Sequence, residues 1–472
     1  MRARDLIKLG IPRGDLGVAG EAARAAGRRG LKKRKLEEAL RQVVEAPQDF
    51  LDDEDFGSLA TALSKRQKAR DSYRERSKPA TYHSWGEGLD PKSIEQMENA
   101  CRLPVSAAGA LMPDAHVGYG LPIGGVLGTR GAVIPYAVGV DIACRMKMTV
   151  LDLPVTALTG QTGRLINAIE NETRFGIGAS FESPRQHDVL DEDWRVSPVT
   201  LKLKDKAWRQ LGTSGSGNHF VEFGTLEISA TGPEHSPPEV LGLDPGTYLA
   251  LLSHSGSRGT GAAVANHYSR LAMDLHPELP KGLRHLAWLD LSTEAGQEYW
   301  AAMELMGHYA AANHALIHRH LAKALGAKVL LDLENHHNFA WKEIHGGEEL
   351  VVHRKGATPA GDGVLGIIPG SMASPAFIVR GKGQPESLDS ASHGAGRRMS
   401  RKQAKESFTW SETRRLLSAR GVTLISADLD EVPMAYKDIE EVMAAQSDLV
   451  ETLATFHPGL VKMAPAGEPP ED

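Results

Sequence analysis

The chain has 472 residues, of which 41% are hydrophobic and 24% charged, and its net charge is −6, as in an ordinary globular protein. It contains no apolar run of about 18 residues, which excludes a membrane-spanning helix. Residues 1–15 lack the apolar core of a secretion signal. Two cysteines, Cys101 and Cys144, cannot form a disulfide framework, so we expect a protein of the reducing cytoplasm.

The first 80 residues differ from the rest in charge and in residue type. They contain 19 Lys and Arg against 13 Asp and Glu, whereas the remaining residues contain 35 against 47. Segments 20–45 and 57–77 are rich in strong helix formers. We therefore predict a basic helical N-terminal region over residues 1–80 and a second domain over residues 81–472. The positive charge indicates either nucleic-acid contact or an ordinary solvated helix face.

The second domain alternates short apolar runs with Gly-rich turns, which predicts an α+β fold with central β-sheets flanked by helices. A helix is expected over 297–325, ended by Gly326. The pattern predicts strands over residues 146–150, 247–253, 328–334, 363–368 and 422–426. Segments 183–198 and 228–240 are expected to be long loops, and the tail after Pro465 is expected to be frayed.

Several common functional motifs are absent. The sequence contains no phosphate-binding P-loop, no dinucleotide-binding Gly fingerprint and no nucleophile elbow. It also lacks the paired motifs of zinc proteases and zinc ribbons. Rossmann enzymes, P-loop enzymes and common hydrolases are therefore poor fits, and any nucleotide site must be built in another way.

Potential metal ligands stand where predicted strands meet Gly-rich turns, namely Asp141, Cys144, His219, His254 and His337. Such a set could hold two metal ions about 3.5–4 Å apart, with the thiolate as a bridge. The donors alone do not choose between Mn, Mg, Zn, Co and Ni. The alternative is that Cys144 is simply a small buried residue.

Other His residues and Cys101 are weaker candidates. His336 is predicted to lie behind the ligands rather than among them. His314 and His318 share a helix face but have no carboxylate nearby in sequence, so we predict a packing or surface role for them. Cys101 lies beside no ligand cluster and is predicted to be structural.

A second candidate is His393, which stands between a Ser and two Gly residues in segment 392–397. Small neighbours would let its imidazole meet a phosphorus atom while main-chain amides hold the oxygens. Imidazole is largely uncharged near neutral pH and can therefore act as a nucleophile. An ordinary Gly-rich turn is the alternative. Segments 213–217, 255–261 and 369–372 are further turns whose amides could cradle phosphates.

Nine segments, in order, resemble the RtcB family of RNA-splicing and RNA-repair ligases, and they extend over about 70% of the chain. These segments are MPDAHVGYGLPIGGV (112–126), VGVDIACRM (138–146), LGTSGSGNHFVEF (211–223), SHSGSRGTG (253–261), ENHHNFAWKE (334–343), VHRKGAT (352–358), GIIPGSM (366–372), SHGAGRRMSRKQAK (392–405) and AYKDI (435–439). The resemblance implies the family's own α+β fold, with a deep cleft for metal and GTP.

The resemblance also implies a role for each matching position. Asp141, Cys144 and His219 would hold one Mn²⁺, and Cys144, His254 and His337 would hold a second in the same subunit. His393 would form a GMP-histidine intermediate. The positions implied to bind GTP are Asn218, His219, Phe220, Val221, Glu222, His337, Asn338, Pro369, Gly370, Ser371, Met372, His393, Gly394, Ala395, Gly396 and Lys437. A further implied contact, to RNA phosphate or GTP, is Arg258.

The implied reaction joins an RNA 3′-phosphate or 2′,3′-cyclic phosphate to a 5′-hydroxyl, through GMP-histidine and an RNA-ppG end. The expected role is tRNA splicing or RNA repair, with RNA (tRNA above all) as the partner and an activating protein as a further candidate. The sequence leaves the oligomeric state open. Two positions depart from the family pattern, since Ala373 and Ala376 stand where Gly and Ser are usual, which places one GTP contact in question.

Two other functions compete with the ligase. A metal phosphoesterase that only opens cyclic phosphates would need the metal ligands but neither His393 nor Lys437. A non-catalytic RNA-binding relative would be expected to have lost ligands. Because all of these residues are present, the sequence favours the ligase. The basic N-terminal region has no counterpart in shorter family members, and we predict that it either contacts RNA or supports the core.

Overall fold

The computed structural model describes residues 1–232 and 234–469 and divides the chain into two compact units. The first unit comprises Met1–Glu75 and Leu271–Ala287, and the second comprises Arg76–Arg270 and Trp288–Asp472. The prediction had placed the boundary at residue 80 and residues 271–287 in the second domain. No helix in the described part of the chain has the length and apolar character that crossing a bilayer needs.

The first unit is helical and has a hydrophobic core of its own. Its N-terminal helices are α1 (Ala3–Lys8), α2 (Leu16–Arg28), α3 (Lys33–Glu45) and α4 (Gly57–Ser72). Leu36, Leu40 and Val43 recur on one face of α3 and pack with Leu59 of α4 in this core. The spacing is that of a single helix face, which explains why the charged side chains of α3 lie on the other side.

The second unit is built around an eight-stranded sheet. Seven strands follow the order β13-β14-β17-β6-β7-β5-β9, and β16 pairs with β17. Their bounds are β5 (Arg145–Leu151), β6 (Phe220–Ile228), β7 (Gly246–Ser255), β9 (Val329–His336), β13 (Leu365–Pro369), β14 (Ala376–Gly381), β16 (Thr423–Ser426) and β17 (Val450–Met463). All five strands that the sequence predicts belong to this sheet. β5 is buried along its whole length, whereas β9 and β16 are largely exposed or half-buried.

A five-stranded sheet of order β1-β2-β3-β11-β10 packs beside the first. Its strands are β1 (Thr81–Ser84), β2 (Ser106–His116), β3 (Ile123–Thr129), β10 (Asn338–His345) and β11 (Glu348–Lys355). Two small pairs complete the strands, β12 (Ala357–Pro359) with β15 (Ser390–Ser392) and β4 (Ala132–Val133) with β8 (Leu289–Asp290). Residues of both large sheets share one core cluster, in which Val126 and Val352 pack with Ile368 and Phe377.

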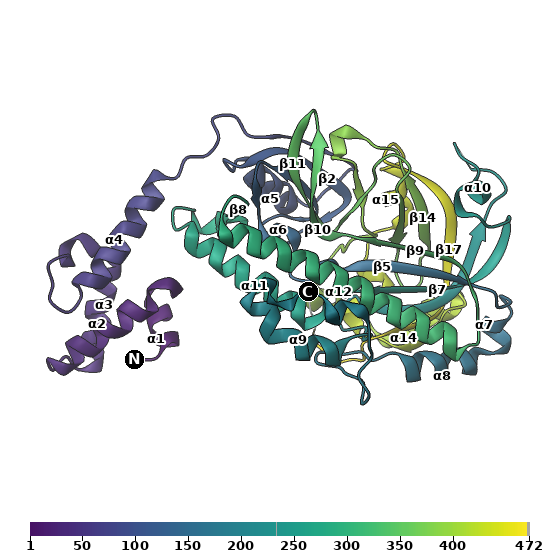
Figure 1. The fold of residues 1–472 in the computed structure, drawn as a ribbon, viewed down its shortest axis with the longest axis horizontal. Coiled ribbons are helices and arrows are strands. Elements are labelled where there is room, and N and C mark those ends of the chain that lie inside the picture. Colours follow the sequence, from purple (N-terminus) through teal and green to yellow (C-terminus); the bar gives the residue numbers. More distant parts are fainter. Residues whose placement is uncertain (233, 470–472) are drawn as a thin grey trace. The chain divides into compact units, whose positions relative to one another are not determined.

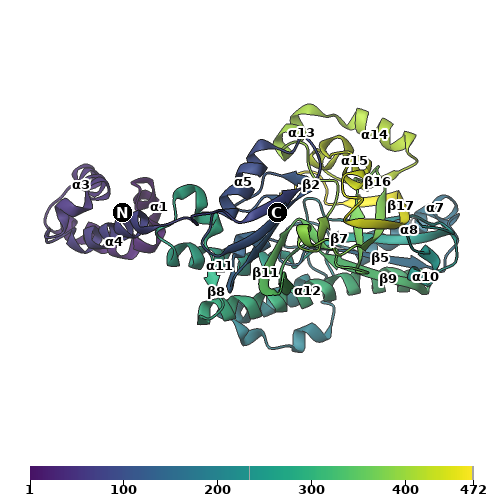
Figure 2. The ribbon, with the colours of Figure 1, turned by 90° about the horizontal axis from the view of Figure 1, so that it is seen from above.

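Helices cover both sides of the eight-stranded sheet. The long helix α12 (Glu294–Ala324) lies along the face that buries Val221, Phe223 and Leu251, and Figure 1 shows it crossing β5 and β7. Figure 2 shows α13 (Arg401–Ser407) and α14 (Trp410–Ala419) on the opposite side from α12. The remaining helices are α5 (Pro91–Cys101), α6 (Pro135–Val138), α7 (Ala157–Gly160), α8 (Thr162–Glu172), α9 (Pro198–Gln210), α10 (Pro237–Leu241), α11 (Arg258–Leu275) and α15 (Ile439–Ala444).

Two segments that were expected to be irregular are more ordered than the sequence suggests. Segment 183–198 contains two short 3₁₀ turns and buries Trp194, whose indole N–H donates to the Val189 carbonyl. The tail beyond Pro465 was expected to be frayed, yet Gly467 N–H donates to Asp428 and the Pro469 carbonyl accepts from Ser216. Both segments are ordered by contacts with distant residues, which local composition does not reveal.

Candidate active site

The antiparallel register of the large sheet brings four strand ends together. Met146 of β5 pairs with His254 of β7, and His254 pairs in turn with Phe220 of β6. On the other side of β5, Arg145 pairs with His336 of β9. The residues just before β5 and β6, and those at or just after the ends of β7 and β9, therefore share one edge. The predicted ligands Cys144, His219, His254 and His337 all stand at this edge.

The five predicted metal ligands contact one another, and we call them the ligand cluster. Cys144 Sγ lies 3.4 Å from His219 Nε2 and 3.1 Å from His254 Nε2. His254 Nε2 lies 3.1 Å from His337 Nε2, and His219 Nε2 lies 3.1 Å from Asp141 Oδ2. All five residues are at most 7% exposed. The thiol is thus in the middle of the cluster, between the two pairs of other ligands.

The loop that carries Asp141 and Cys144 is fixed by main-chain hydrogen bonds. The Ala143 N–H donates to the Asn338 carbonyl, and the His337 N–H donates to the Cys144 carbonyl. Ala143 adopts a left-handed backbone conformation (φ 57°) that non-glycine residues seldom occupy and that costs about 1–3 kcal/mol. This local strain turns the loop so that a carboxylate and a thiol three residues apart reach the same cluster.

Small residues around the ligand cluster make room for its charged side chains. A Cβ on Gly256 would lie 2.0 Å from the Asp141 carboxylate, which also accepts hydrogen bonds from the Ser257 amide and hydroxyl. A Cβ on Gly215 would lie 2.0 Å from the Arg258 guanidinium. Turns 213–217 and 255–261 therefore need glycine for this internal packing, in addition to any contact with phosphate.

Arg258 is a buried part of this arrangement. It is 2% exposed and, like Ala143, has a left-handed backbone conformation (φ 58°). Its guanidinium lies 3.3 Å from both Thr213 Oγ1 and His219 Nδ1. The side chain thus supports a ligand from behind, and a contact with RNA phosphate or GTP stays a prediction.

The electrostatics favour ligands that are ready to bind a cation. Burial, reinforced by His219, lowers the pKa of His254 to about 3, and burial with the neighbouring His393 and His254 holds the pKa of His337 well below its usual range. Burial raises the pKa of Asp141, but its contacts with His219 and the nearby Arg258 outweigh this and leave that pKa below its usual value. At neutral pH the cluster therefore presents the uncharged imidazoles of His254 and His337 and the carboxylate of Asp141.

Hydrogen bonds also direct a lone pair into the cluster. His254 Nδ1 lies 3.1 Å from the Asn218 carbonyl and so carries the proton that it donates there, which leaves Nε2 with a lone pair facing Cys144. Nδ1 of His337 is buried and has no hydrogen-bond partner among the described residues. A donor set of one thiol, one carboxylate and three imidazoles with these properties fits transition-metal ions, manganese among them.

His393 lies beside the ligand cluster, on the segment Ser392–Gly396 that we call the nucleophile turn. Its ring centroid is 5.0 Å from that of His337. Its Nδ1 lies 2.7 Å from Asp114 Oδ2, which also accepts from the His393 main-chain N–H at 3.2 Å. Asp114 is fully buried at the end of β2. Because Nδ1 donates to this carboxylate, Nε2 keeps the lone pair that a nucleophile needs.

Lys437 supports the main chain on both sides of Asp114. Its Nζ donates to the Pro113 carbonyl at 3.0 Å and to the Ala115 carbonyl at 2.8 Å, so it binds the residues immediately before and after Asp114. Burial lowers the pKa of Lys437, and the Asp114 carboxylate opposes this shift. The observed contacts give Lys437 a positioning role, and its contact with GTP stays a prediction.

The other positions predicted to bind GTP surround the nucleophile turn and the ligand cluster. The Ala395 N–H donates to the Pro369 carbonyl, so turns 369–372 and 393–396 are joined. Asn338 donates to the Asp141 carbonyl and accepts from the Gly356 N–H, which lies next to the nucleophile turn. Phe220 packs against His254, whereas Val221 and Glu222 are buried within β6, where burial raises the pKa of Glu222 to about 8.

The two positions that depart from the family pattern, Ala373 and Ala376, are both buried. Ala373 is buried, and the neighbouring Ser371 and Ser374 hydroxyls lie 2.9 Å apart. Ala376 opens β14, where it pairs with Pro369 and packs in the apolar core. A serine hydroxyl is thus still present at this turn, in Ser374.

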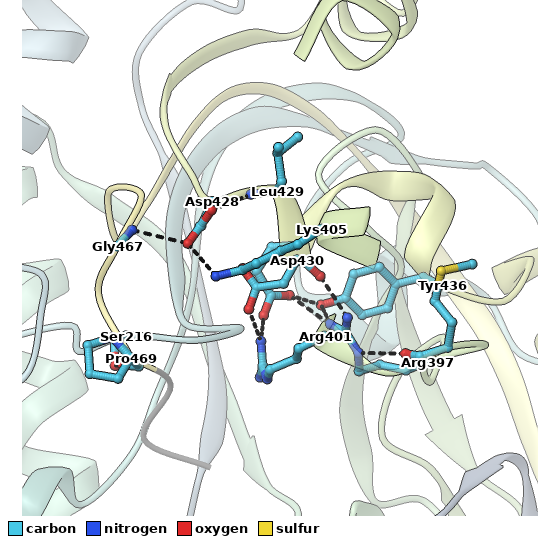
Figure 3. A network of polar contacts seen from close by, with 12 residues as sticks. Ser216, Arg397, Arg401, Lys405, Asp428, Leu429, Asp430, Tyr436, Gly467 and Pro469 are labelled. Atoms are coloured by element: carbon cyan, nitrogen blue, oxygen red, sulfur yellow. Dashed lines mark hydrogen bonds and ion pairs between the residues drawn. The ribbon is translucent and has the colours of Figure 1, made fainter. Parts of the chain in front are cut away.

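An ionic network holds the chain that follows the nucleophile turn (Figure 3). Arg397 and Arg401 both bond Glu431, which is 2% exposed, and the Tyr436 hydroxyl donates to the same carboxylate. Lys405 bonds Asp428 at 2.8 Å. These cations, Arg397, Arg401 and Lys405, are spaced four residues apart and so project from one side of the turn and of helix α13. Their ion pairs fix where the turn ends.

A sequence model described as tRNA-splicing ligase RtcB matches residues 96–463, a range that includes the whole ligand cluster and His393. The chain belongs to this family. RtcB of Escherichia coli K12, an RNA-splicing ligase, is 35% identical over 79% of this chain and 94% of its own length. The tRNA-splicing ligase RtcB of Methanococcus maripaludis is 30% identical over 75% of this chain and 87% of its own length. The RNA-splicing ligase RtcB homolog 1 of Entamoeba dispar is 27% identical over 74% of this chain and 77% of its own length.

Membership of the RtcB family confirms the predicted resemblance and the α+β fold, and it makes the chain a ligase of the RNA-splicing type. Residues 1–95 and 464–472 lie outside the matched range. The expected deep cleft stays a prediction. Two cavities of about 630 and 470 Å³ lie elsewhere, one between α14 and β16 and the other between α12 and strands β5 and β9. Neither is lined by His393 or by a residue of the ligand cluster.

The functional residue that sequence reasoning missed is Asp114. It lies inside a segment that carried the family resemblance, yet no role was assigned to it, because 279 positions separate it from His393. The hydrogen-bonded support from Ser257 was missed for the same reason. The only local sign of a role for Asp114 was that it is a single carboxylate near the end of a buried strand.

The His residues that were set aside are structural. His314 and His318 both bond the Ser253 hydroxyl, and His318 also bonds Thr149, so they join α12 to the back of the sheet. His336 packs against Trp341 and Phe339 rather than the ligand cluster. Cys101 is buried, and burial raises its pKa to about 12.

Proposed function

We propose that the protein is a GTP- and manganese-dependent RNA ligase that joins an RNA 3′-phosphate or 2′,3′-cyclic phosphate to a 5′-hydroxyl. The single observation that carries the proposal is the hydrogen bond between His393 and the buried Asp114 beside the ligand cluster, because it orients one imidazole nitrogen for attack on phosphorus. The names of the relatives support the class of substrate, since they are ligases of RNA splicing and tRNA splicing.

In the first step Nε2 of His393 attacks the α-phosphorus of GTP. An N–P bond forms, the bond from the α-phosphorus to the bridging oxygen breaks, and pyrophosphate leaves. Asp114 keeps the proton on Nδ1 and stabilises the positive charge that the imidazole gains. The joined turns 369–372 and 393–396 offer main-chain N–H groups to the guanylate.

In the second step the RNA 3′-phosphate takes the guanylate from His393. An oxygen of the RNA phosphate attacks the same phosphorus, the N–P bond breaks, and an RNA-ppG end results. In the third step the 5′-hydroxyl of the other RNA attacks the 3′-phosphorus, loses its proton, and expels GMP. A cyclic phosphate is first opened by water to the 3′-phosphate.

Two Mn²⁺ ions per subunit would be held by the ligand cluster, with Cys144 common to both, Asp141 and His219 on one side and His254 and His337 on the other. When bound there, they would stabilise the negative charge that develops on phosphoryl oxygens in each step. The chain's own contribution is to keep these ligands aligned through Asn218, Ser257 and Arg258.

A phosphoesterase limited to cyclic phosphates is the competing function. It would need the ligand cluster, but it would gain nothing from a buried carboxylate that orients His393. The Asp114–His393 pair therefore favours the ligase.

The first step can be tested without RNA. The protein is incubated with Mn²⁺ and GTP or ATP carrying a labelled α-phosphate, and the chain is examined for label that is lost in acid and kept in alkali, as expected of a phosphoramidate. We expect label from GTP alone, none in His393→Ala, and unchanged label in His308→Ala, an exposed His that pairs with Glu192. Absence of label in the unaltered, metal-loaded protein would overturn the proposal and favour the phosphoesterase.

A further inference from the structure

Positive charge in the helical first unit is densest in sequence at the turn between α2 and α3. Six of the eight residues from Arg28 to Lys35 are Lys or Arg. Arg29 is paired with Glu54 and Asp55. The other five, which we call the basic turn, are exposed, and within residues 1–232 and 234–469 the structure gives them no ion pair. They are Arg28, Lys32, Lys33, Arg34 and Lys35.

The stability of the fold does not explain these cations. Helix α3 begins at Lys33, has no side chain capping its first turn, and has no acidic residue there. The first turn of a helix favours negative charge, so cations at this place cost stability, typically about 0.3–1 kcal/mol each. The apolar residue of the turn, Leu31, packs on the core and leaves the cations outside.

The nearest acidic residues in sequence, Glu37 and Glu38 of α3, form no ion pair with the basic turn within the described part of the chain. Residues 45–55 carry six Asp and Glu, and they neutralise Arg29 alone among the cations of residues 28–35. A merely solvated face would mix both signs, whereas a surface for a polyanion concentrates one. Long Lys and Arg side chains on a turn suit phosphates along a flexible strand, because they need no fixed base geometry.

The part of the unit that carries the basic turn, Met1–Glu75, also lies outside the range that the family shares, since the family match begins at residue 96. It has its own core, so its surface is free to serve a purpose apart from the chemistry. We propose that the basic turn is a docking surface for the phosphate backbone of the single-stranded RNA on which the enzyme acts. This inference rests on the proposed function for the identity of the polyanion.

The test uses the full-length protein and a fluorescein-labelled single-stranded RNA about 20 nucleotides long, longer than the site of one binding module. Anisotropy is measured between about 0.05 and 0.2 M salt. The variant is Lys32→Gln/Lys33→Gln/Lys35→Gln. The matched control is Arg2→Gln/Arg4→Gln/Lys8→Gln, which removes the same charge from exposed residues of α1 and its N-cap in the same unit.

We expect the basic-turn variant to bind RNA about 10–100-fold more weakly at 0.1 M salt, with the salt slope smaller by about 2, because each lost phosphate contact to a single strand contributes about 0.7. The control should change much less. Unchanged affinity and slope in the basic-turn variant, or an equal loss in the two variants, would overturn the proposal.

Two further measurements keep the result interpretable. Thermal unfolding followed by circular dichroism should show that the basic-turn variant is at least as stable as the unaltered protein, because unfavourable cations have been removed from a helix start. Labelling by GTP needs no RNA and should be unchanged in both variants. Loss of labelling in the unaltered protein would refute the proposed ligase, while the anisotropy result would still decide whether the basic turn binds RNA.

Discussion

The ligand cluster and the nucleophile turn are neighbours that are built in different ways. The five ligands lie at or near the ends of four strands and form a continuous chain of contacts, in the order Asp141, His219, Cys144, His254 and His337. His393 instead depends on one buried carboxylate, Asp114, which bonds both its ring and its main chain. The comparison teaches that metal capacity and nucleophile orientation rest on separate contacts and can be altered separately.

The largest expected effect is that of Cys144→Ala on metal binding. The thiol lies between His219 and His254, so its loss should weaken both metal sites, by more than the roughly 10–100-fold typical of residues behind the ligands. Manganese bound after dialysis, measured by mass spectrometry, checks this. His393→Ala should retain its metal. Two tightly bound ions in Cys144→Ala would show that the thiol is not shared.

Asp114→Asn should have the reverse effect to Cys144→Ala. It should slow the attachment of guanylate to His393 and leave metal binding unchanged. An Asn amide can donate to Nδ1 of His393, which would move the imidazole proton to Nε2 and remove the nucleophilic lone pair. We expect the rate of labelling by GTP to fall about 10²–10⁴-fold, the usual contribution of a positioned proton-transfer group. Loss of bound manganese in this variant would contradict the separation of the two regions.

A smaller effect within the ligand cluster is expected from Gly256→Ala. The new methyl group would lie 2.0 Å from the Asp141 carboxylate and must push this ligand aside. Manganese affinity should fall about 10–100-fold, with the His393–Asp114 contact left intact. Gly163→Ala is the matched control, because a Cβ there meets open space on α8. Equal titration curves for the two variants would mean that Asp141 is not a ligand.

The sequence predicted the residues of the ligand cluster, but it did not predict that Asp114 supports His393. Cys144, His254 and His337 each stand next to a predicted strand, and His219 precedes the apolar residues of segment 220–223, so strand pattern and ligand type together indicated a shared site at the strand ends. The edge they share follows from the register of β5, β6, β7 and β9, which no local pattern encodes.

Contacts between distant segments account for what sequence reasoning did not foresee. Asp114 reaches His393, Ser216 reaches Pro469, and residues 271–287 join the first unit, each across more than 190 positions. Composition correctly indicated helices in the first unit, because segments 20–45 and 57–77 are rich in strong helix formers. It could not indicate that Trp194 would be buried, since that depends on packing against Tyr309 of α12.

A buried charge next to the nucleophile turn should make stability depend on pH. Lys355 is 7% exposed, donates to the Tyr119 carbonyl, and has its pKa lowered by burial to about 7. Below that pH the folded protein must bury a charge that the unfolded chain keeps in water. Above it the folded protein releases the proton, so its stability rises toward pH 10.5 by up to about 1.4 kcal/mol per pH unit.

Lys355→Met should therefore raise the free energy of unfolding most below pH 7, and this gain should shrink as the pH rises from 7. Urea unfolding at a series of pH values measures the difference. Lys323→Met, at an exposed position on α12, is the control and should give a difference that does not vary with pH. A constant gain in Lys355→Met would show that the buried amine keeps its proton in the folded protein, as it does in the unfolded chain.

The smallest effect is expected where the C-terminal tail meets the loop before His219. The Ser216 hydroxyl donates to the Pro469 carbonyl, and the Glu468 carboxylate accepts from the Ile177 N–H. Ser216→Ala removes one such bond and should lower the free energy of unfolding by about 0.5–1.5 kcal/mol. Hydrogen exchange should become faster at Gly467, whose N–H bonds Asp428. Manganese affinity should stay unchanged, because the ligand cluster is held by its own contacts. A loss of affinity comparable to that of Gly256→Ala would instead make the tail a support of the ligand cluster.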